Sequence, residues 1–326
     1  MTQPTRPLIL RLRNWVGDVV LGLPTLQRLA EEGYDLRLIG KAWAADLLAG
    51  HGWPVVTLPG RFGDRLGQLR SLRRQARVDD PGFDRRLNSL CLPFSFSSAL
   101  EFRLAGLRAI GHAHEGRSLL LSRSLQRVAG QHELAVYWQL GSALLGQDAP
   151  LPAAIRLRPS AAHRAAARAL RERFGIAPGY IVICPFAGGT FEGLDKTWPL
   201  FAEFVASQLP DFGRQVLICP GPGEEAQARE QFGSALLLPG VTLGTYAALL
   251  QDAALMISND TGPGHIAAAV GTPLLSVLGP TDPGQWGAWG PSVRVVRRWP
   301  GWPTLAEVGA ATGQLLAPTL STPPSP

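Results

Sequence analysis

Residues 257–280, ISNDTGPGHIAAAVGTPLLSVLGP, combine residue types suited to binding an anion. An apolar run ending at Ile257 predicts a buried strand, and Gly262 and Gly264 follow it, where a ligand can approach the backbone closely. A helix predicted from His265 to Val270 directs free N–H groups and the positive end of its dipole at the loop. Nucleotide phosphate is therefore the expected ligand.

Three polar side chains accompany this anion site, namely Asp260, Thr261 and His265. Asp260 has an alternative role as a helix cap, and His265 has one as a packing residue. Taken together at the end of a buried strand, we interpret them as a binding site. A sugar–nucleotide diphosphate would use such groups, with His265 and N–H donors on phosphate and Asp260 on ribose or sugar hydroxyls.

A second glycine-rich loop occurs in PFAGGTFEGLDKTWP, residues 185–199. Gly188 and Gly189 allow a tight turn beside a phosphate, and the hydroxyl of Thr190 can donate to it. Lys196 follows in a chain with few lysines, and its compact positive charge suits phosphate or ribose oxygens. The alternative is a solvated loop lysine.

The loop RNWVGDVVLGLP, residues 13–24, follows the first predicted strand. Gly17 permits a tight turn and can offer its N–H to a phosphate. Asp18 stands near the start of the next helix, where it has two readings. It is either a helix cap or a general base that the helix terminus keeps ionised.

Strands and helices alternate along both halves of the chain, which predicts the α/β class with parallel sheets. The predicted strands of the first half are 8–12, 36–39, 55–58, 86–92 and 109–110, and its helices are 19–29, 42–49, 97–107 and 132–145. The second half has predicted strands at 180–184, 215–219, 255–257 and 273–278, and helices at 161–174, 200–208, 223–232, 245–251 and 265–270.

A Pro- and Ala-rich segment, residues 147–159, divides the two halves and predicts a linker. We therefore expect one domain over 1–150, a second over 151–317 and a disordered tail over 318–326. Two such domains place a central cleft between the carboxyl ends of their sheets, where ligands bind.

The composition of the 326 residues is that of a globular protein, with 46% hydrophobic and 17% charged residues. Cys91, Cys184 and Cys219 lie in apolar segments without metal-ligand spacing, so we expect buried free thiols in a reducing compartment. No metal cluster, P-loop, G-x-S-x-G or G-x-G-x-x-G motif is evident. Without a membrane-spanning run or signal pattern, we expect a cytoplasmic protein.

The formal net charge of +6 lies wholly in the first half of the chain. Residues 1–150 hold 19 Lys and Arg against 13 Asp and Glu, and residues 61–86 hold much of the excess. This segment is either a solvated face or a surface for phosphorylated glycan, lipid headgroups or nucleic acid. Nucleic acid is the weaker option because aromatic residues are not interleaved with the arginines.

Four blocks resemble the heptosyltransferases of lipopolysaccharide core assembly, glycosyltransferase family 9. They are LRNWVGDVVLGLPTLQRL, FSFSSALEFRLAGLRAIGHAHEGRSLLL, DKTWPLFAEF and SNDTGPGHIAAAVGTPLLSVLGPTDP, and they stand in the family's order. The resemblance implies the GT-B fold, in which two Rossmann-like domains face a central cleft. The first would bind mainly the acceptor and the second mainly the nucleotide sugar.

The resemblance also implies an inverting, metal-independent transfer of heptose from ADP-heptose to a hydroxyl of an anionic lipid A–core acceptor, with no cofactor. Asp18 matches the family's catalytic base and Lys196 its donor-binding lysine. The donor loop matches Asp260, Thr261, Gly262 and His265. We expect the acceptor to meet Asn14, Arg65 and Arg117 of the basic first domain, with peripheral contact at the inner face of the cytoplasmic membrane as a further option.

Two other functions remain open. A GT-B-like epimerase would convert the nucleotide sugar without an acceptor. A non-catalytic module would bind a sugar nucleotide or an anionic glycan without turning it over.

Overall fold

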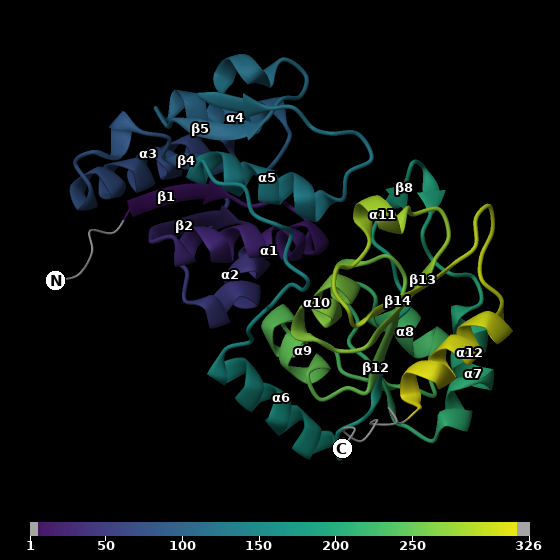
Figure 1. The fold of residues 1–326 in the computed structure, drawn as a ribbon. Coiled ribbons are helices and arrows are strands. Elements are labelled where there is room, and N and C mark those ends of the chain that lie inside the picture. The colour runs from purple at the N-terminus through teal and green to yellow at the C-terminus, as the bar shows by residue number, and fades with distance from the viewer. Residues whose placement is uncertain (1–5, 318–326) are drawn as a thin grey trace, which may run out of the picture.

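The computed structural model describes residues 6–317, which form two α/β domains that lie against one another (Figure 1). Each domain has a six-stranded sheet in which every pairing is parallel. The prediction of two Rossmann-like parallel sheets is therefore confirmed. The disordered tail expected over 318–326 lies outside the described residues.

The first domain has the strand order β3-β2-β1-β4-β5-β6. Its strands are β1 (Arg6–Arg11), β2 (Tyr34–Gly40), β3 (Val55–Thr57), β4 (Ser89–Cys91), β5 (Ala109–His112) and β6 (Arg123–Leu125). Its helices are α1 (Val16–Glu31), α2 (Ala42–Leu48), α3 (Phe62–Asp79), α4 (Phe96–Leu104) and α5 (Glu133–Leu145), with 3-10 turns at Ala49–His51, Phe83–Arg85 and Arg117–Leu120.

The second domain has the strand order β11-β10-β7-β12-β13-β14 and a separate antiparallel hairpin, β8-β9. Its strands are β7 (Ile181–Cys184), β8 (Thr190–Phe191), β9 (Leu194–Asp195), β10 (Val216–Ile218), β11 (Leu236–Leu237), β12 (Leu255–Ser258), β13 (Leu274–Leu278) and β14 (Val293–Arg297). Its helices are α6 (Ala161–Phe174), α7 (Phe201–Ser207), α8 (Glu225–Gln231), α9 (Leu243–Leu250), α10 (Gly262–Val270), α11 (Pro283–Trp286) and α12 (Leu305–Leu316), with a 3-10 turn at Leu209–Phe212.

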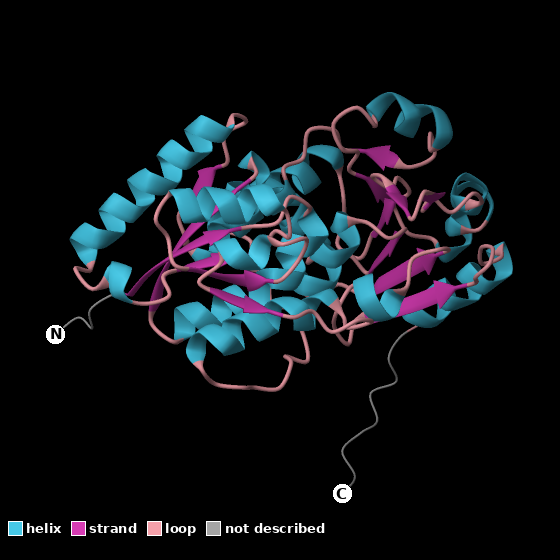
Figure 2. Cartoon of the chain, turned by 90° about the horizontal axis from the view of Figure 1, so that it is seen from above, coloured by secondary structure: helices cyan, strands magenta, loops and turns pink. Residues whose placement is uncertain are grey.

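Helices cover both faces of each sheet, as the view from above shows (Figure 2). Successive residues of β1 point to opposite faces, so Leu8 and Leu10 enter one apolar core while Ile9 enters the core beneath α3 and α4. The core that contains Leu8 continues through α1, α2 and α5 into α9 and α10 of the second domain. The two domains are thus packed together through the helices on their inner faces.

The chain order of both sheets reverses beside the first strand of each domain. In the first sheet the reversal lies between β1 and β4, and in the second it lies between β7 and β12. Ligands of doubly wound sheets bind at the carboxyl ends of the strands at such a switch point. The loops after these four strands, which we call the switch-point loops, are residues 12–15, 92–95, 185–189 and 259–261.

Two helices begin earlier than the sequence predicted. Helix α1 starts at Val16, so Gly17 and Asp18 belong to its first turn. Helix α10 starts at Gly262, so Gly264 is also helical. Eight elements had not been predicted at all, namely α3, α11, α12, β6, β8, β9, β11 and β14.

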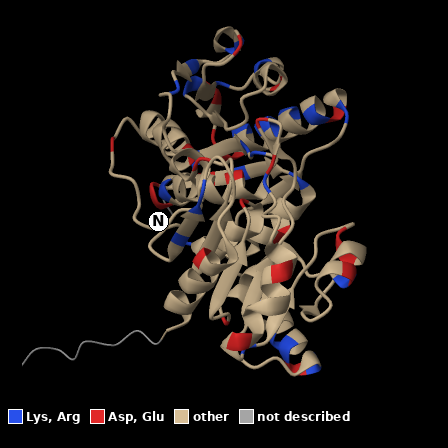
Figure 3. Cartoon of the chain, turned by 90° about the vertical axis from the view of Figure 1, so that its right-hand side faces the viewer, with Lys and Arg blue, Asp and Glu red and all other residues tan. Residues whose placement is uncertain are grey.

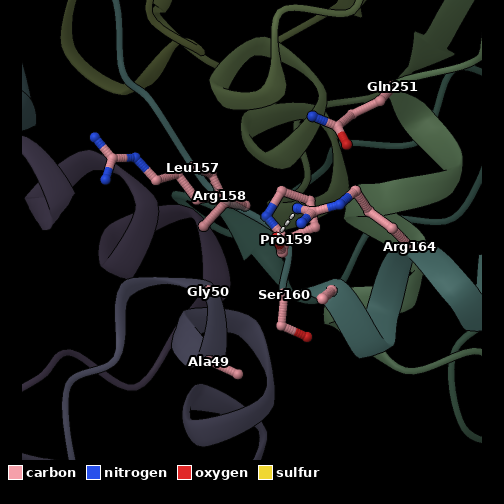
Figure 4. A pocket seen from close by; sticks show the side chains of 9 residues that line it. Ala49, Gly50, Leu157, Arg158, Pro159, Ser160, Arg164 and Gln251 are labelled. Carbon is pink, nitrogen blue, oxygen red and sulfur yellow. Dashed lines mark hydrogen bonds between the residues drawn. The ribbon is translucent and has the colours of Figure 1, made fainter.

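A second contact between the domains joins α2 to α6 and α9 and involves none of the switch-point loops. The carboxylate of Asp46, on α2, accepts from the backbone N–H of Gly244 at 2.7 Å and lies 3.0 Å from Nε2 of His163. The pocket beside it lies between residues 49–50 and the end of the linker, and Arg158 and Arg164 are among its lining residues (Figure 4). This pocket is therefore separate from the switch-point loops.

Basic side chains are denser in the upper, first domain than in the second (Figure 3). Helix α3 carries much of this charge, and its buried residues are Leu69, Leu72 and Ala76. Many of its arginines are paired with acidic side chains, as in Arg73–Asp84, so part of the charge is neutralised locally. Within residues 6–317, no helix has the length and apolar character needed to cross a membrane.

Candidate active site

Asp18 lies in the first turn of α1, with its side chain only 9% exposed. The hydroxyl of Tyr137 donates to its Oδ1 at 2.8 Å, and Nε of Arg13 lies 3.4 Å from its Oδ2. Asp18 is not the helix cap, because Trp15 occupies that position. A carboxylate here is stabilised by the helix dipole and by its two neighbours, and it is held in one orientation.

Phe94 and two arginines form a cluster beside Asp18. The guanidinium of Arg13 lies 4.4 Å from the centre of the Phe94 ring, and that of Arg127 lies 4.3 Å from it. Arg127 also pairs with the buried carboxylate of Glu133. Cation–π contacts fix the two guanidinium groups in place, which leaves donors of Arg13 available to an anionic ligand.

The three residues expected to bind an acceptor lie in different settings. Asn14 is exposed in a switch-point loop. Arg65 donates to Oε1 of the buried Glu101 at 2.8 Å and to the carbonyl of Gly60 at 2.6 Å, so much of its donor capacity is used within the domain.

Arg117 requires a correction, because it is fully buried and cannot contact an acceptor as expected. Its guanidinium donates to the backbone carbonyls of Pro93 and Ser95. These residues flank Phe94, so Arg117 supports the loop that carries Phe94. Arg117 therefore stabilises the conformation of the loop formed by residues 92–95.

Helices α1 and α10 meet at their N-termini, at what we call the domain junction (Val16, Gly17, Gly262 and His265). A Cβ placed on Gly17 would lie 2.9 Å from Cδ2 of His265, and one on Gly262 would lie 2.6 Å from Cβ of Val16. Both distances are too short for a real side chain. Glycine at these positions therefore permits the close approach of the two helix ends.

His265 is buried at the domain junction, and its Nδ1 has no hydrogen-bond partner among the described residues. Burial lowers its pKa, an effect that the carboxylates of Asp260 and Asp18 oppose and that Lys196 reinforces. The lowered pKa favours the neutral imidazole, whose one N–H can donate to an anionic ligand.

Asp260 and Lys196 lie together beside the N-terminus of α10. Nζ of Lys196 lies 3.2 Å from the carbonyl oxygen and 3.4 Å from Oδ2 of Asp260. The hydroxyl of Thr281 donates to the same Oδ2 at 3.0 Å. Asp260 is therefore not the cap of α10; Thr261 is, and its side chain makes no capping hydrogen bond.

The remaining predicted donor residues differ in position. Thr190 is exposed in the β8-β9 hairpin, opposite Asp195 and close in sequence to Lys196. Gly188 and Gly189 lead into that hairpin, and a Cβ on Gly188 would lie 3.9 Å from the indole of Trp15 in the first domain. Gly264 is buried in α10, where a Cβ would lie 2.8 Å from Oγ of Ser258, so its role is packing.

Sequence analysis missed several residues that build this site, namely Arg13, Phe94, Arg127, Glu133, Tyr137, Asn259 and Thr281. Asn259 is buried; its side chain donates to the carbonyl of Pro185 and accepts from the N–H of Trp198, which ties the donor loops together. Arg13 and Asn259 lie within predicted motifs, and Phe94 and Thr281 lie within blocks that carry the family resemblance, whereas Arg127, Glu133 and Tyr137 lie in none of them. Across residues 6–317, no three His, Cys, Asp or Glu side chains are grouped as metal ligands.

A family model described as glycosyltransferase family 9 (heptosyltransferase) matches residues 72–308. Lipopolysaccharide heptosyltransferase 3 of Escherichia coli is 32% identical over 167 residues, which are 48% of this chain and 47% of that relative. This match thus spans about half of the relative's length. Lipopolysaccharide heptosyltransferase 2 of Escherichia coli (strain K12) is 28% identical over 326 residues, 92% of this chain and 90% of that one.

The fold matches a solved heptosyltransferase of E. coli with ADP, at a TM-score of 0.69 and 22% identity. The match covers 95% of this chain and 99% of that one. At this identity the comparison establishes the two-domain GT-B architecture, which the sequence predicted.

Proposed function

This chain belongs to glycosyltransferase family 9, and from that premise we propose that it transfers a heptose or a related sugar from an ADP-sugar to a hydroxyl of an anionic, lipid-linked glycan. The acceptor we propose is the lipopolysaccharide inner core. One observation carries the proposal: a fixed carboxylate, Asp18, lies across the domain junction from an uncapped helix N-terminus flanked by Lys196 and His265.

The second domain holds the donor in this proposal. The first N–H groups of α10 bind the diphosphate, because no side chain within the described residues caps that helix. Lys196 turns from Asp260 toward the phosphates, and His265 donates to them from the other side. Asp260 and Thr281 are left to accept and donate hydrogen bonds with ribose or sugar hydroxyls.

The reaction is a single displacement. Asp18 takes the proton of the acceptor hydroxyl as its oxygen bonds to C1 of the sugar, and the bond from C1 to the diphosphate oxygen breaks. Attack from the face opposite the leaving group inverts the anomeric centre. The charge that develops on ADP is stabilised by α10, Lys196 and His265, so this mechanism requires neither a metal nor a cofactor.

The acceptor enters along the first domain. Arg13 and Arg127 are both held against the ring of Phe94, where their guanidinium groups suit a phosphate or carboxylate near the reacting hydroxyl. The exposed Asn14 lies in the same loop as Arg13. A lipid-linked acceptor would bring the protein to the inner face of the cytoplasmic membrane as a peripheral enzyme.

Two measurements test this function. Isothermal titration with ADP-, GDP- and UDP-sugars should give clearly tighter binding of the ADP-sugar, and equal affinities would remove the support for ADP-heptose. Asp18→Asn should abolish transfer while donor affinity stays nearly unchanged.

Asp64→Asn is the matched control, because Asp64 is an exposed carboxylate in the first turn of α3. It has the same relation to a helix dipole but lies outside the site. Substantial turnover by Asp18→Asn, or equal losses in the two variants, would exclude Asp18 as the base.

A further inference from the structure

Glu133 is a buried carboxylate that the proposed reaction does not use. It is the first residue of α5 and is 1% exposed. Its Oε1 pairs with Arg127, whereas its Oε2 has no hydrogen-bond partner among residues 6–317. Buried polar atoms without partners are uncommon, and they are costly unless they serve a purpose.

Tyr137 connects Glu133 to Asp18. Tyr137 follows Glu133 by one helical turn on α5, so the two side chains share a face of the helix. Its hydroxyl donates to Oδ1 of Asp18 at 2.8 Å and also stabilises the ionised form of Glu133. The phenolic proton is donated to Asp18, and Glu133 lies one helical turn away on the same face of α5.

Charged groups from several elements face the carboxyl groups of Asp18 and Glu133. Arg13 approaches Asp18 from the loop before α1, Arg127 approaches Glu133 from the segment before α5, and His265 faces Asp18 from α10. Burial raises the pKa of Glu133, while Arg127 and Arg13 oppose that rise and the charge of Asp18 adds to it. Burial and Asp18 raise the pKa of Tyr137 well above its usual value, so its hydroxyl keeps the proton that it donates.

In the second domain, the charges of Lys196 and Asp260 act on His265. They are not among the groups that act on Glu133. Besides Arg13, Asp18 is thus flanked by one hydrogen-bond donor and one neighbouring carboxylate, both on α5. These two influences have opposite signs. The donor favours the ionised base, and the carboxylate disfavours it.

We propose that Tyr137 and Glu133 are positioning residues for Asp18. Tyr137 fixes Oδ1, so that Oδ2 is the oxygen that faces the acceptor hydroxyl, and Glu133 adds a second negative charge to the surroundings of the base. This inference rests on the proposed function, because a positioning role requires that Asp18 is the base. The contacts among the three side chains do not depend on that function.

The test measures the pH titration of Asp18 by 13C NMR of carboxyl-labelled protein, together with the pH dependence of ADP release from ADP-heptose. Tyr137→Phe removes a donor to the charged form and should move the midpoint of both curves upward by about 1 pH unit. Glu133→Gln removes a neighbouring negative charge and should move both midpoints downward by about half a unit.

Two buried residues supply matched controls. Tyr246→Phe alters a buried tyrosine whose hydroxyl contacts the sulfur of Met256, and Glu101→Gln alters a buried glutamate paired with Arg11 and Arg65. Neither control should move the midpoints. Near-UV circular dichroism of each variant confirms that the fold is retained.

The outcomes separate the two proposals. Opposite shifts in Tyr137→Phe and Glu133→Gln support the positioning role, and unchanged midpoints or shifts in one direction overturn it. If the NMR midpoints shift as expected but the wild-type protein releases no ADP from ADP-heptose with a lipopolysaccharide acceptor, the positioning role stands and the proposed function fails.

Discussion

Gly17→Ala tests whether the ends of α1 and α10 are in contact during catalysis. The new Cβ would lie 2.9 Å from Cδ2 and 3.1 Å from Nε2 of His265, so the imidazole must move or the domains must separate. The first alternative has little room, because His265 is buried. In the proposed mechanism His265 donates to the leaving phosphate, so its displacement by a few tenths of an ångström should lower kcat/KM about tenfold, or roughly 1.4 kcal/mol in the barrier.

Stability should change in the opposite direction. Gly17 has helical backbone geometry, and alanine is favoured over glycine inside a helix by up to about 1 kcal/mol. The first domain should therefore unfold at an equal or higher denaturant concentration. A variant with lower activity and undiminished stability would locate the loss at the domain junction rather than in folding.

Gly22→Ala is the control within the same helix. Its Cβ would lie 3.8 Å from the nearest atoms of Leu92 and Tyr137, which is an ordinary contact distance. It should therefore match Gly17→Ala in stability while keeping its transfer rate and donor affinity. If Gly17→Ala is as active as Gly22→Ala, the two helix ends do not approach closely in the working enzyme, and the reasoning fails.

Three further predictions concern single residues. Burial and two arginines lower the pKa of the enclosed His112 to about 4, below its unfolded value, so stability is complete above about pH 6.5 and declines toward pH 4. His112 should contribute about 2 kcal/mol to the fall in unfolding free energy between pH 7 and 5, measured by chemical denaturation. His112→Leu should reduce that fall by about this amount, whereas exposed His114→Gln should leave it unchanged. Lys196→Met should weaken ADP binding about tenfold by calorimetry, and retained affinity would remove Lys196 from the donor site. Arg117→Met should raise the acceptor KM several-fold without changing donor affinity, and an unchanged KM would separate Arg117 from the Phe94 loop.

Much of the architecture could be predicted because buried parallel strands appear as short apolar runs. The switch-point loops follow those runs directly, so Asp18 and Asp260 were found from their place at strand ends. The starts of α1 and α10 were misplaced because glycine was interpreted as a loop residue. At the first positions of a helix the N–H groups have no intrahelical partner, and glycine there is favoured by close approach of another backbone.

The elements that were missed have different physical reasons. Helix α3 was missed because its many arginines draw attention away from a narrow apolar stripe. The stripe is formed by Leu69, Leu72 and Ala76, whose spacing of three and four residues is helical. Tyr137 lies 119 residues from Asp18 along the chain, so its hydrogen bond exists only once α5 packs on α1. Arg117 looked like a surface charge, since sequence alone does not reveal that nearby carbonyls enclose it.

The two helices at the domain junction differ in the charge of their first turns, although neither has a side-chain cap. Two helix N-termini that approach one another bring together two positive dipole ends, which repel. In α1 the carboxylate of Asp18 lies in the first turn and offsets that charge, whereas α10 has no acidic residue in its first turn and no side-chain cap. The uncompensated end belongs to α10, and in the proposed function the diphosphate of the donor supplies the missing negative charge. Donor binding should therefore draw the two helix ends together and bring Asp18 toward C1 of the sugar, so the acceptor hydroxyl meets its base only when the leaving group is in place.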